Sequence, residues 1–296
     1  MKRVGAVAFS MVMATGLLGT SALASTKPAA VSAVGNSAVG NPLPAPNTLL
    51  PLGEAVPQAA APPKPATGTP KTYKVYATRE GLTGHTTANG HKIVANDHFV
   101  SLPSTLSLAG KGDNDYSVRV CSVANSRCAY EPVWDVGPWN THDDYWAIKR
   151  TSWTKLPSGK PEAQAAYQDG YNGGKDQFGR KVLNPAGIDL ADGTIRDGLD
   201  LSSSGWVNVT YLWTGGGARG TIATDGGTVN VRSGDSTSHK VVGVAGPYAQ
   251  IPIVCKIKGQ LINRSGTTAS WYRMAKGNYI SAAYVNVSSK TTIKTC

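Results

Sequence analysis

The sequence predicts an all-β protein built mainly from short strands. The chain of 296 residues contains 34 glycines and 18 prolines, and both residue types interrupt helices and form turns. From Thr72 onward, apolar and polar residues alternate in runs of a few residues, as they do in half-buried strands. A Gly-rich break at residues 215–217 separates two such regions, so we expect two β domains, 71–214 and 215–296.

The N-terminal 70 residues predict export. Two basic residues precede an apolar run over residues 4–18, which is followed by small residues, so residues 1–24 are expected to form a signal peptide. That run is short for a membrane span, and no later stretch approaches the roughly 20 apolar residues that a span needs. Residues 25–70 are rich in Ala and Pro, which predicts a disordered linker. We therefore expect a secreted, extracellular protein with no membrane span.

The clearest element of the first domain is a β-hairpin over residues 116–134. Its turn falls near residue 125, which places Cys121 opposite Cys128. The four cysteines allow three pairings, and an oxidising exterior favours disulfides over metal ligands. Nearness in sequence and the domain division favour Cys121–Cys128 and Cys255–Cys296.

The rest of the first domain predicts one helix and one closing strand. Pro161 precedes an Ala-rich run that stops at Gly170, and proline suits the first turn of a helix. A strand is expected over residues 206–213. The insertion at residues 139–186 is otherwise irregular, so we expect it to carry function or to wrap around the strands.

Short strands also dominate the second domain, which has the size of a small β-barrel. Small barrels bury little apolar surface, so a disulfide would stabilise this one. The strands are expected at residues 228–232, 251–256, 271–273 and 279–280.

Positive charge is concentrated in the second domain. The formal net charge of +11 includes Lys2 and Arg3, which would leave with the signal peptide. Residues 71–214 hold 15 basic and 15 acidic residues, whereas residues 215–296 hold 10 basic and 2 acidic residues. A basic exported module would be attracted to anionic wall polymers or lipid surfaces, and the alternative is that the charge only aids solubility. We do not expect nucleic acid as a partner, because no recognition motif is visible.

Several short motifs follow one another along the first domain: Thr86-Thr87-Ala88-Asn89-Gly90, His98, Leu102-Pro103, Asp135-Val136-Gly137-Pro138, Gly187-Ile188-Asp189-Leu190 and a closing strand from Trp206. In order and spacing they resemble the double-psi β-barrels of expansins, rare lipoprotein A and barwin-like proteins. The resemblance implies a six-stranded double-psi β-barrel with a ligand groove. The Streptomyces papain inhibitor is another barrel of similar general plan. One departure is His91, which stands where rare lipoprotein A has a glutamate.

The second domain carries the run Val229-Asn230-Val231-Arg232-Ser233-Gly234 and, near its end, Trp271-Tyr272-Arg273 and the run Tyr279–Val285. These residues resemble the bacterial SH3-like (SH3b) domain. The resemblance implies a small SH3-like β-barrel that binds the cell wall or a peptide ligand without catalysis.

Asp135 and Asp189 are the candidate catalytic residues. The barrel topology implied by the resemblance should bring their carboxyl groups into one groove. Two carboxyl groups in a poorly hydrated cleft repel each other, so one can keep a proton at neutral pH and act as a general acid. The alternative is that both aspartates accept hydrogen bonds from backbone amides in tight loops.

Aromatic and polar residues near Asp135 are the candidate ligand contacts. Trp139 and Trp146 would stack on sugar rings, with Asn140 and His98 beside them. The alternative is that the tryptophans form the core of the insertion, which we favour for Trp134. His85, His91 and His98 do not match a recognised metal-ligand spacing, and we expect neither a metal nor another cofactor.

Together these features predict a secreted, wall-associated bacterial protein that binds peptidoglycan or another wall glycan in the barrel groove. Binding without turnover is favoured. One alternative is a peptidoglycan lytic transglycosylase, with Asp135 or Asp189 as the acid/base. A second alternative is an inhibitor whose partner is a papain-like cysteine protease.

Overall fold

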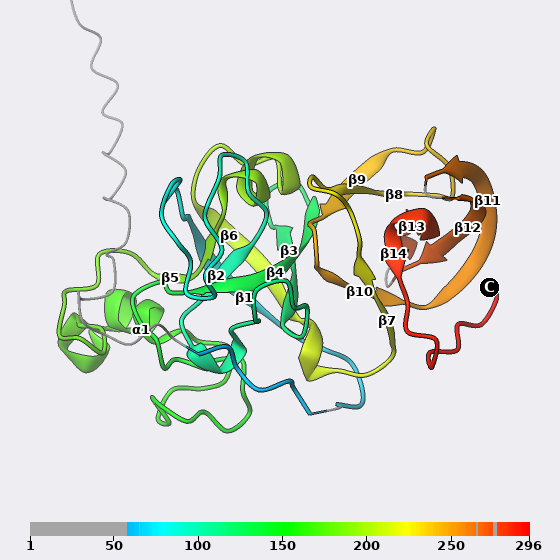
Figure 1. Cartoon of the computed structure of the whole chain (residues 1–296). Helices are drawn as coiled ribbons and strands as arrows, with labels where there is room; N and C mark the ends of the chain where they lie inside the picture. Colours follow the sequence, from blue (N-terminus) through cyan, green and yellow to red (C-terminus); the bar gives the residue numbers. More distant parts are fainter. Residues whose placement is uncertain (1–57, 65, 265, 275–276) are drawn as a thin grey trace, which may run out of the picture. The chain divides into compact units, whose positions relative to one another are not determined.

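The protein is described by a computed structural model that covers residues 58–296 except 65, 265, 275 and 276. The expected signal peptide and the expected linker up to residue 57 lie outside the described residues. Most regular structure in the described part is β strand, as expected (Figure 1). Among the described helices, none is both long and apolar enough to cross a membrane.

Six strands form a closed barrel, which confirms the expected strand number. They are β1 (Lys71–Arg79), β2 (Val100–Leu102), β3 (Ser117–Ser122), β4 (Cys128–Val136), β5 (Ala186–Leu190) and β6 (Gly205–Tyr211). Their order is β4-β2-β5-β1-β6-β3, and β3 pairs again with β4 to close the barrel. The pairs β1–β5 and β2–β4 are parallel, and this mixed arrangement is compatible with a double-psi barrel.

Shorter elements connect these strands. The expected helix is present as α1 (Glu162–Asp169), and Gly170 ends it in the left-handed conformation at φ 68°. A disulfide links Cys121 to Cys128 across the β3–β4 hairpin, as expected. The remaining turns are η1 (Thr105–Ser107), η2 (Tyr171–Gly174), the π-helical turn η3 (Thr194–Gly198) and η4 (Leu212–Thr214).

The C-terminal residues form further short strands. They are β7 (Ala218–Ile222), β8 (Val229–Arg232), β9 (Val241–Ala245), β10 (Gln250–Ile253), β11 (Cys255–Asn263), β12 (Thr267–Arg273), β13 (Tyr279–Ser281) and β14 (Val285–Asn286), with the turn η6 (Ala282–Tyr284) before β14. Strands β10, β7 and β14 form a separate three-stranded sheet. The second expected disulfide, Cys255–Cys296, is also present.

Strand β9 joins the C-terminal strands to the barrel, because it pairs in parallel with β4 over Cys128–Tyr130. Gly243 lies opposite Cys128, and a Cβ there would overlap the carbonyl oxygen of Cys128. Side chains add to this junction, since Asn114 donates a hydrogen bond to Thr221 (2.7 Å) and accepts one from Gln250 (2.9 Å).

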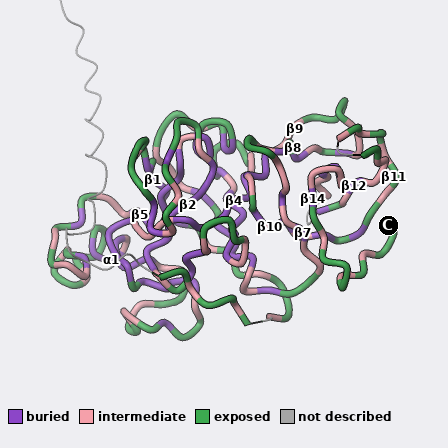
Figure 2. The backbone as a smooth tube through the Cα atoms, viewed as in Figure 1, coloured by how far each residue is buried: buried purple, intermediate pink, exposed green. Residues whose placement is uncertain are grey.

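Two main apolar clusters form the core. One fills the barrel, and the other lies among the C-terminal strands but includes Tyr130 of β4. Buried residues accordingly follow the barrel strands, while the connecting loops are largely exposed (Figure 2). The described end of the expected linker lies against the barrel, because the amide of Ala60 donates to the carbonyl of Leu108 (2.8 Å) and Tyr116 donates to the carbonyl of Ala61 (2.6 Å).

Candidate functional site

Asp135 and Asp189 lie in one row across three neighbouring strands. Ser101 at the centre of β2 is paired with Asp135 of β4 on one side and with Asp189 of β5 on the other. Residues in register on adjacent strands place their side chains on the same face of a sheet. The structure therefore brings the two candidate aspartates to one place, although they are 54 positions apart in the sequence.

Glu80 is a third carboxyl group beside this row, and no motif in the sequence indicated it. It follows directly after β1, where its amide donates to the carbonyl of Leu190 (2.8 Å) and its carboxyl accepts a hydrogen bond from the Ser101 hydroxyl. Asp189 accepts one from the Thr78 hydroxyl. We refer to Glu80, Asp135 and Asp189 as the carboxylate cluster.

The surroundings of the carboxylate cluster favour the protonated form of Glu80. Burial raises the pKa of Glu80 well above its usual value of 4.5, and the negative charges of Asp135 and Asp189 raise it further. Burial also raises the pKa of Asp135, but the amides of Ala88 and Val136 and the Glu80 carboxyl stabilise its charged form. The pKa of Glu80 is therefore raised more clearly than that of Asp135, and the two carboxyl groups interact directly.

Asp135 is the member of the cluster that a ligand can reach. Glu80 and Asp189 are only 7% and 5% exposed, whereas Asp135 is of intermediate exposure. Its Oδ1 accepts hydrogen bonds from the amides of Ala88 and Val136, both at 2.8 Å. These contacts match the alternative interpretation in which the aspartate satisfies backbone amides, and the carboxyl group also interacts with Glu80.

The turn at residues 86–92 aims the Ala88 amide at Asp135. Thr87 donates from its hydroxyl to the side chain of Asn89 (2.7 Å) and accepts from the amide of His91 (3.1 Å). Gly90 has φ 85°, a conformation that glycine adopts without a steric penalty. The motif at residues 86–90 therefore positions Asp135 of the motif at residues 135–138.

The candidate aromatic contacts are buried. Trp139 is 9% exposed, packs beside α1 and donates its indole N–H to Asn184 (3.0 Å). Trp146 is 5% exposed and stacks on Tyr211, with ring centroids 5.1 Å apart. Their packing favours the alternative in which they form core, because neither offers an open ring face to a sugar.

Asn140 is also buried and is occupied by internal hydrogen bonds. Its Nδ2 donates to Glu162 Oε2 (2.8 Å), and its Oδ1 accepts from the amide of Gln177 (2.9 Å). Burial raises the pKa of Glu162 to about 7. Asn140 therefore holds together two parts of the insertion, helix α1 and the segment at Gln177.

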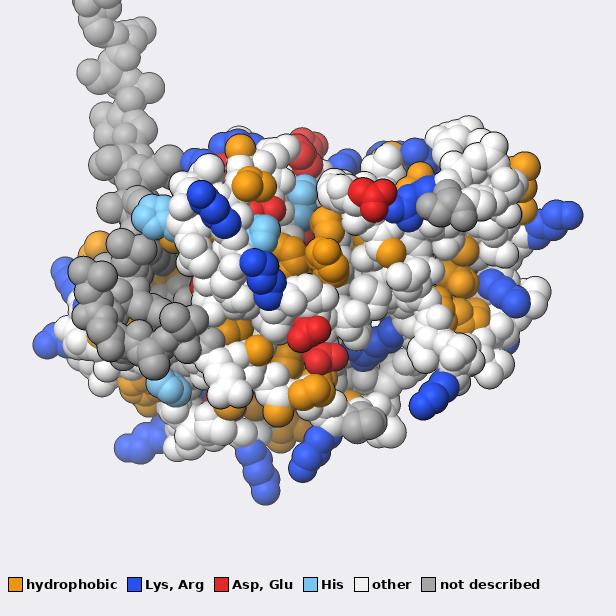
Figure 3. Space-filling model, in the orientation of Figure 1, with side chains coloured by type: hydrophobic (Ala, Val, Ile, Leu, Met, Phe, Trp, Pro, Cys, Tyr) orange, Lys and Arg blue, Asp and Glu red, His pale blue; other side chains and the backbone are white. Residues whose placement is uncertain are grey.

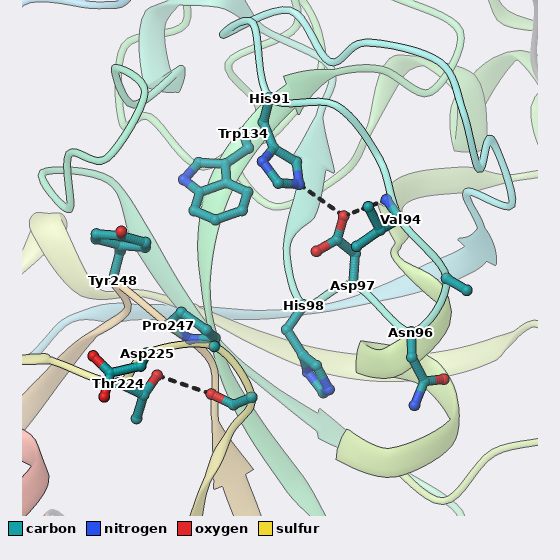
Figure 4. A pocket seen from close by; sticks show the side chains of 13 residues that line it. His91, Val94, Asn96, Asp97, His98, Trp134, Thr224, Asp225, Pro247 and Tyr248 are labelled. Carbon is teal, nitrogen blue, oxygen red and sulfur yellow. Dashed lines mark hydrogen bonds and ion pairs between the residues drawn. The ribbon is translucent and has the colours of Figure 1, made fainter.

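His98 lies at a different place, beside a cavity of about 550 Å³. This cavity is lined by the loop at residues 91–98 and Trp134 on the barrel side, and by residues 224–227 and 247–248 on the C-terminal side (Figure 4). We refer to it as the inter-barrel cavity. His98 Nδ1 lies 3.0 Å from Glu131 Oε1, and both side chains are almost fully buried.

His91 lines the same cavity, whereas His85 does not. His91 Nε2 is 2.7 Å from Asp97 Oδ2, and its ring centroid is 4.7 Å from that of Trp134. In the described part of the chain, no three or more His, Cys, Asp or Glu side chains are arranged to hold a metal ion.

Comparison with known proteins adds one finding. A family model described as "Domain of unknown function (DUF8814)" matches residues 71–210. This range begins at the first residue of β1 and ends one residue before the end of β6, so it contains all six barrel strands and none of the C-terminal strands. No curated protein matches the chain.

Proposed function

We propose that this chain is an exported bacterial protein that binds peptidoglycan or another wall glycan in the groove of a double-psi β-barrel. The observation that carries the proposal is the row formed by Asp135, Ser101 and Asp189, with Glu80 beside it. Asp135 is the partly exposed end of this row, and a carboxylate there suits a hydroxyl group of a sugar, while the buried members support it from behind. The parallel strand pairs and the ordered motifs support the expansin-like and rare-lipoprotein-A-like interpretation.

The C-terminal strands form, in this proposal, an SH3b-like module that associates with anionic wall polymers. Residues 215–296 carry 10 basic and 2 acidic residues. Lys256 and Lys258 are exposed on β11, and Figure 3 shows lysine and arginine side chains distributed over this part of the surface. Attraction of this kind is screened by salt, so wall association should weaken as ionic strength increases.

Binding without turnover is favoured over cleavage. Glu80, whose pKa is raised well above its usual value, is only 7% exposed. Asp135 is held by two amides, which stabilise its carboxylate form and suit it to accept hydrogen bonds from a ligand.

A peptidoglycan lytic transglycosylase is the second candidate, and the proton in the carboxylate cluster favours it. A transglycosylase needs one acid/base group, and a proton on Glu80 can reach a ligand oxygen through Asp135. The proton would pass to the glycosidic oxygen as the bond to the anomeric carbon breaks. The sugar's own hydroxyl would then close an anhydro ring and return a proton to Asp135.

The deciding experiment incubates the chain without residues 1–24 with insoluble peptidoglycan. Pelleted protein measures binding, and mass spectrometry of the supernatant measures cleavage. We expect pelleting without soluble fragments, and weaker pelleting for the Asp135→Asn, Asp189→Asn double variant. Asp200→Asn, which removes an exposed carboxyl group outside the cluster, is the control.

Anhydro-muropeptides that disappear in the double variant would establish the transglycosylase instead. Equal pelleting of wild type and double variant would contradict the barrel groove as the binding site. If neither pelleting nor products occurred, wall binding would be wrong, and inhibition of papain would become the next activity to measure.

A further inference from the structure

We propose that the inter-barrel cavity is a second binding site, which takes a ligand carrying an ammonium or guanidinium group on an apolar stem. A lysine or arginine side chain of a peptide has this chemistry. The site lies outside the carboxylate cluster. Its ligand is cationic, whereas the basic C-terminal surface would attract anions.

The size and walls of the cavity suit a small ligand. Its volume of about 550 Å³ falls within the range of about 300–1,000 Å³ that is typical of ligand pockets. The barrel contributes part of the lining, and the loops that connect β7 to β8 and β9 to β10 contribute the rest. The cavity therefore exists only where the two meet. Figure 4 shows these side chains converging from the two sides.

Aromatic rings form one wall. The Trp134 ring lies between His91, at a centroid distance of 4.7 Å, and Tyr248, at 6.0 Å. Phe99 stacks behind Trp134 at 6.0 Å and fixes its orientation. Trp134 is itself only 5% exposed, so the ring that a cation can approach is that of Tyr248, whose face attracts a cation through its quadrupole.

Tyr248 is held in a strained conformation at this wall. Its φ is 63°, a region that bulky residues rarely adopt, and its side chain remains 44% exposed. The amide of Tyr248 donates to the carbonyl of Ile222 (3.0 Å), and the amide of Gly246 donates to the carbonyl of Tyr130 (2.8 Å). Backbone strain of this kind is concentrated at functional sites, where the surrounding structure maintains it.

The charge of the lining selects a cation. Asp97 and Asp225 line the cavity, and none of its 13 described lining residues is Lys or Arg. Arg264 lies 3.5 Å from Asp225 but is not part of the lining. In a chain with a formal charge of +11, a lining with two aspartates and no Lys or Arg favours a cationic ligand over an anionic one.

The pKa of His98 also responds to the carboxyl groups around the cavity. Burial by itself would lower the pKa of His98, but the negative charges of Glu131, Asp197 and Asp97 outweigh burial and raise it. Glu131, 3.0 Å from His98, balances positive charge on that ring, so the attraction of a ligand cation rests on Asp97 and Asp225 of the lining. Asp197 is held near the cavity by a hydrogen bond from Asn96 (2.7 Å).

A matched pair of small probes tests the proposal on the whole chain without residues 1–24. Nα-acetyl-lysinamide carries the ammonium group, and Nα,Nε-diacetyl-lysinamide has a similar stem without the charge. Titration followed by the indole N–H resonances in a nitrogen–proton NMR spectrum gives the dissociation constant. We expect the charged probe to bind roughly tenfold more tightly, because cation–π and charge attraction depend on the ammonium group.

Two variants identify the cavity as the site, and a third is the control. Tyr248→Asn keeps a residue type that tolerates positive φ but removes the ring, and Asp225→Asn removes a fully exposed charge. Each should weaken binding of the charged probe roughly two- to fivefold. Asp169→Asn removes a bridged, exposed carboxyl group on α1 and should leave binding unchanged.

Equal binding of the two probes, or no binding of the charged probe, would overturn the proposal. Unchanged affinity in both cavity variants would place the amine elsewhere and would also overturn it. Binding of N-acetylglucosamine in place of the amine would identify a neutral-sugar site instead. None of these outcomes depends on whether the carboxylate cluster binds wall glycan, because the variants lie outside that cluster.

Discussion

Replacing Glu80 by glutamine tests whether the carboxylate cluster holds a proton at neutral pH. Burial and the charges of Asp135 and Asp189 raise the pKa of Glu80 well above 4.5, whereas the unfolded chain releases this proton near pH 4.5. Above that pH, the folded protein binds one more proton than the unfolded chain, so its free energy of unfolding falls as pH rises. One retained proton gives a slope of about −1.4 kcal/mol per pH unit, which ends where folded Glu80 itself ionises.

Glutamine has nearly the shape of a neutral glutamic acid and can still accept the hydrogen bond from Ser101, but it has no proton to lose. The difference in unfolding free energy between Glu80→Gln and wild type should therefore grow by about 1.4 kcal/mol per pH unit above roughly pH 5, in favour of the variant. Urea denaturation at a series of pH values, with both disulfides intact, measures this difference. Asp169→Asn controls for the loss of a carboxyl group outside the cluster.

A difference that stays constant across the pH series would refute the argument. It would mean that Glu80 is ionised in the folded protein and that the cluster does not store a proton on it. The transglycosylase alternative would then lose the group that supplies its acid, while glycan binding through Asp135 would be unaffected.

Two further predictions concern stability. Replacing Cys255 and Cys296 by serine should lower the free energy of unfolding by about 2–4 kcal/mol, measured by urea denaturation with the hairpin disulfide intact, and an unchanged value would contradict the stabilising role of this crosslink. Gly246→Ala should cost about 1–3 kcal/mol, because its Cβ would overlap the buried carboxyl of Glu131. Gly205→Ala, with no atom within 4 Å of the added Cβ, is the matched control, and equal losses in the two variants would show that the overlap is relieved.

Local patterns in the sequence predicted the elements whose partners lie close along the chain. The disulfide of the β3–β4 hairpin joins cysteines only 7 positions apart, so alternation and turn position were sufficient. Helix α1 was predicted from Pro161 and Gly170, which occupy its two ends. The junction between β4 and β9 was not predicted, because it joins Cys128 to Gly243 and no local pattern encodes that contact.

Glu80 shows why part of the site could not be found from the sequence. Simple alternation along β1 from Val75 and Ala77 would place Arg79 inside and Glu80 outside. Between Tyr76 and Ala77, however, the register with β5 shifts, and the buried positions change phase. A shift of this kind redirects every later side chain, so Glu80 faces the cluster and Arg79 faces solvent.

The insertion was assigned less accurately than the barrel for a related reason. The sequence alone does not show whether a tryptophan is exposed or buried. Only the packing of Trp146 against Tyr211 and of Trp139 against α1 shows that both belong to the core. Because both rings are buried, neither is available to a ligand. In the inter-barrel cavity, by contrast, a loop that is distant in the sequence supplies the ring of Tyr248.

Strand β4 connects the two proposed sites. Trp134 and Asp135 are consecutive residues, and consecutive side chains on a strand point to opposite faces. Trp134 faces the inter-barrel cavity and Asp135 faces the carboxylate cluster. Both places contain acidic residues although the chain as a whole is basic, so the net charge of the chain does not indicate the charge of either site. A ligand in each site would contact the same strand from opposite sides, and the Tyr248→Asn and Asp135→Asn substitutions alter one face at a time.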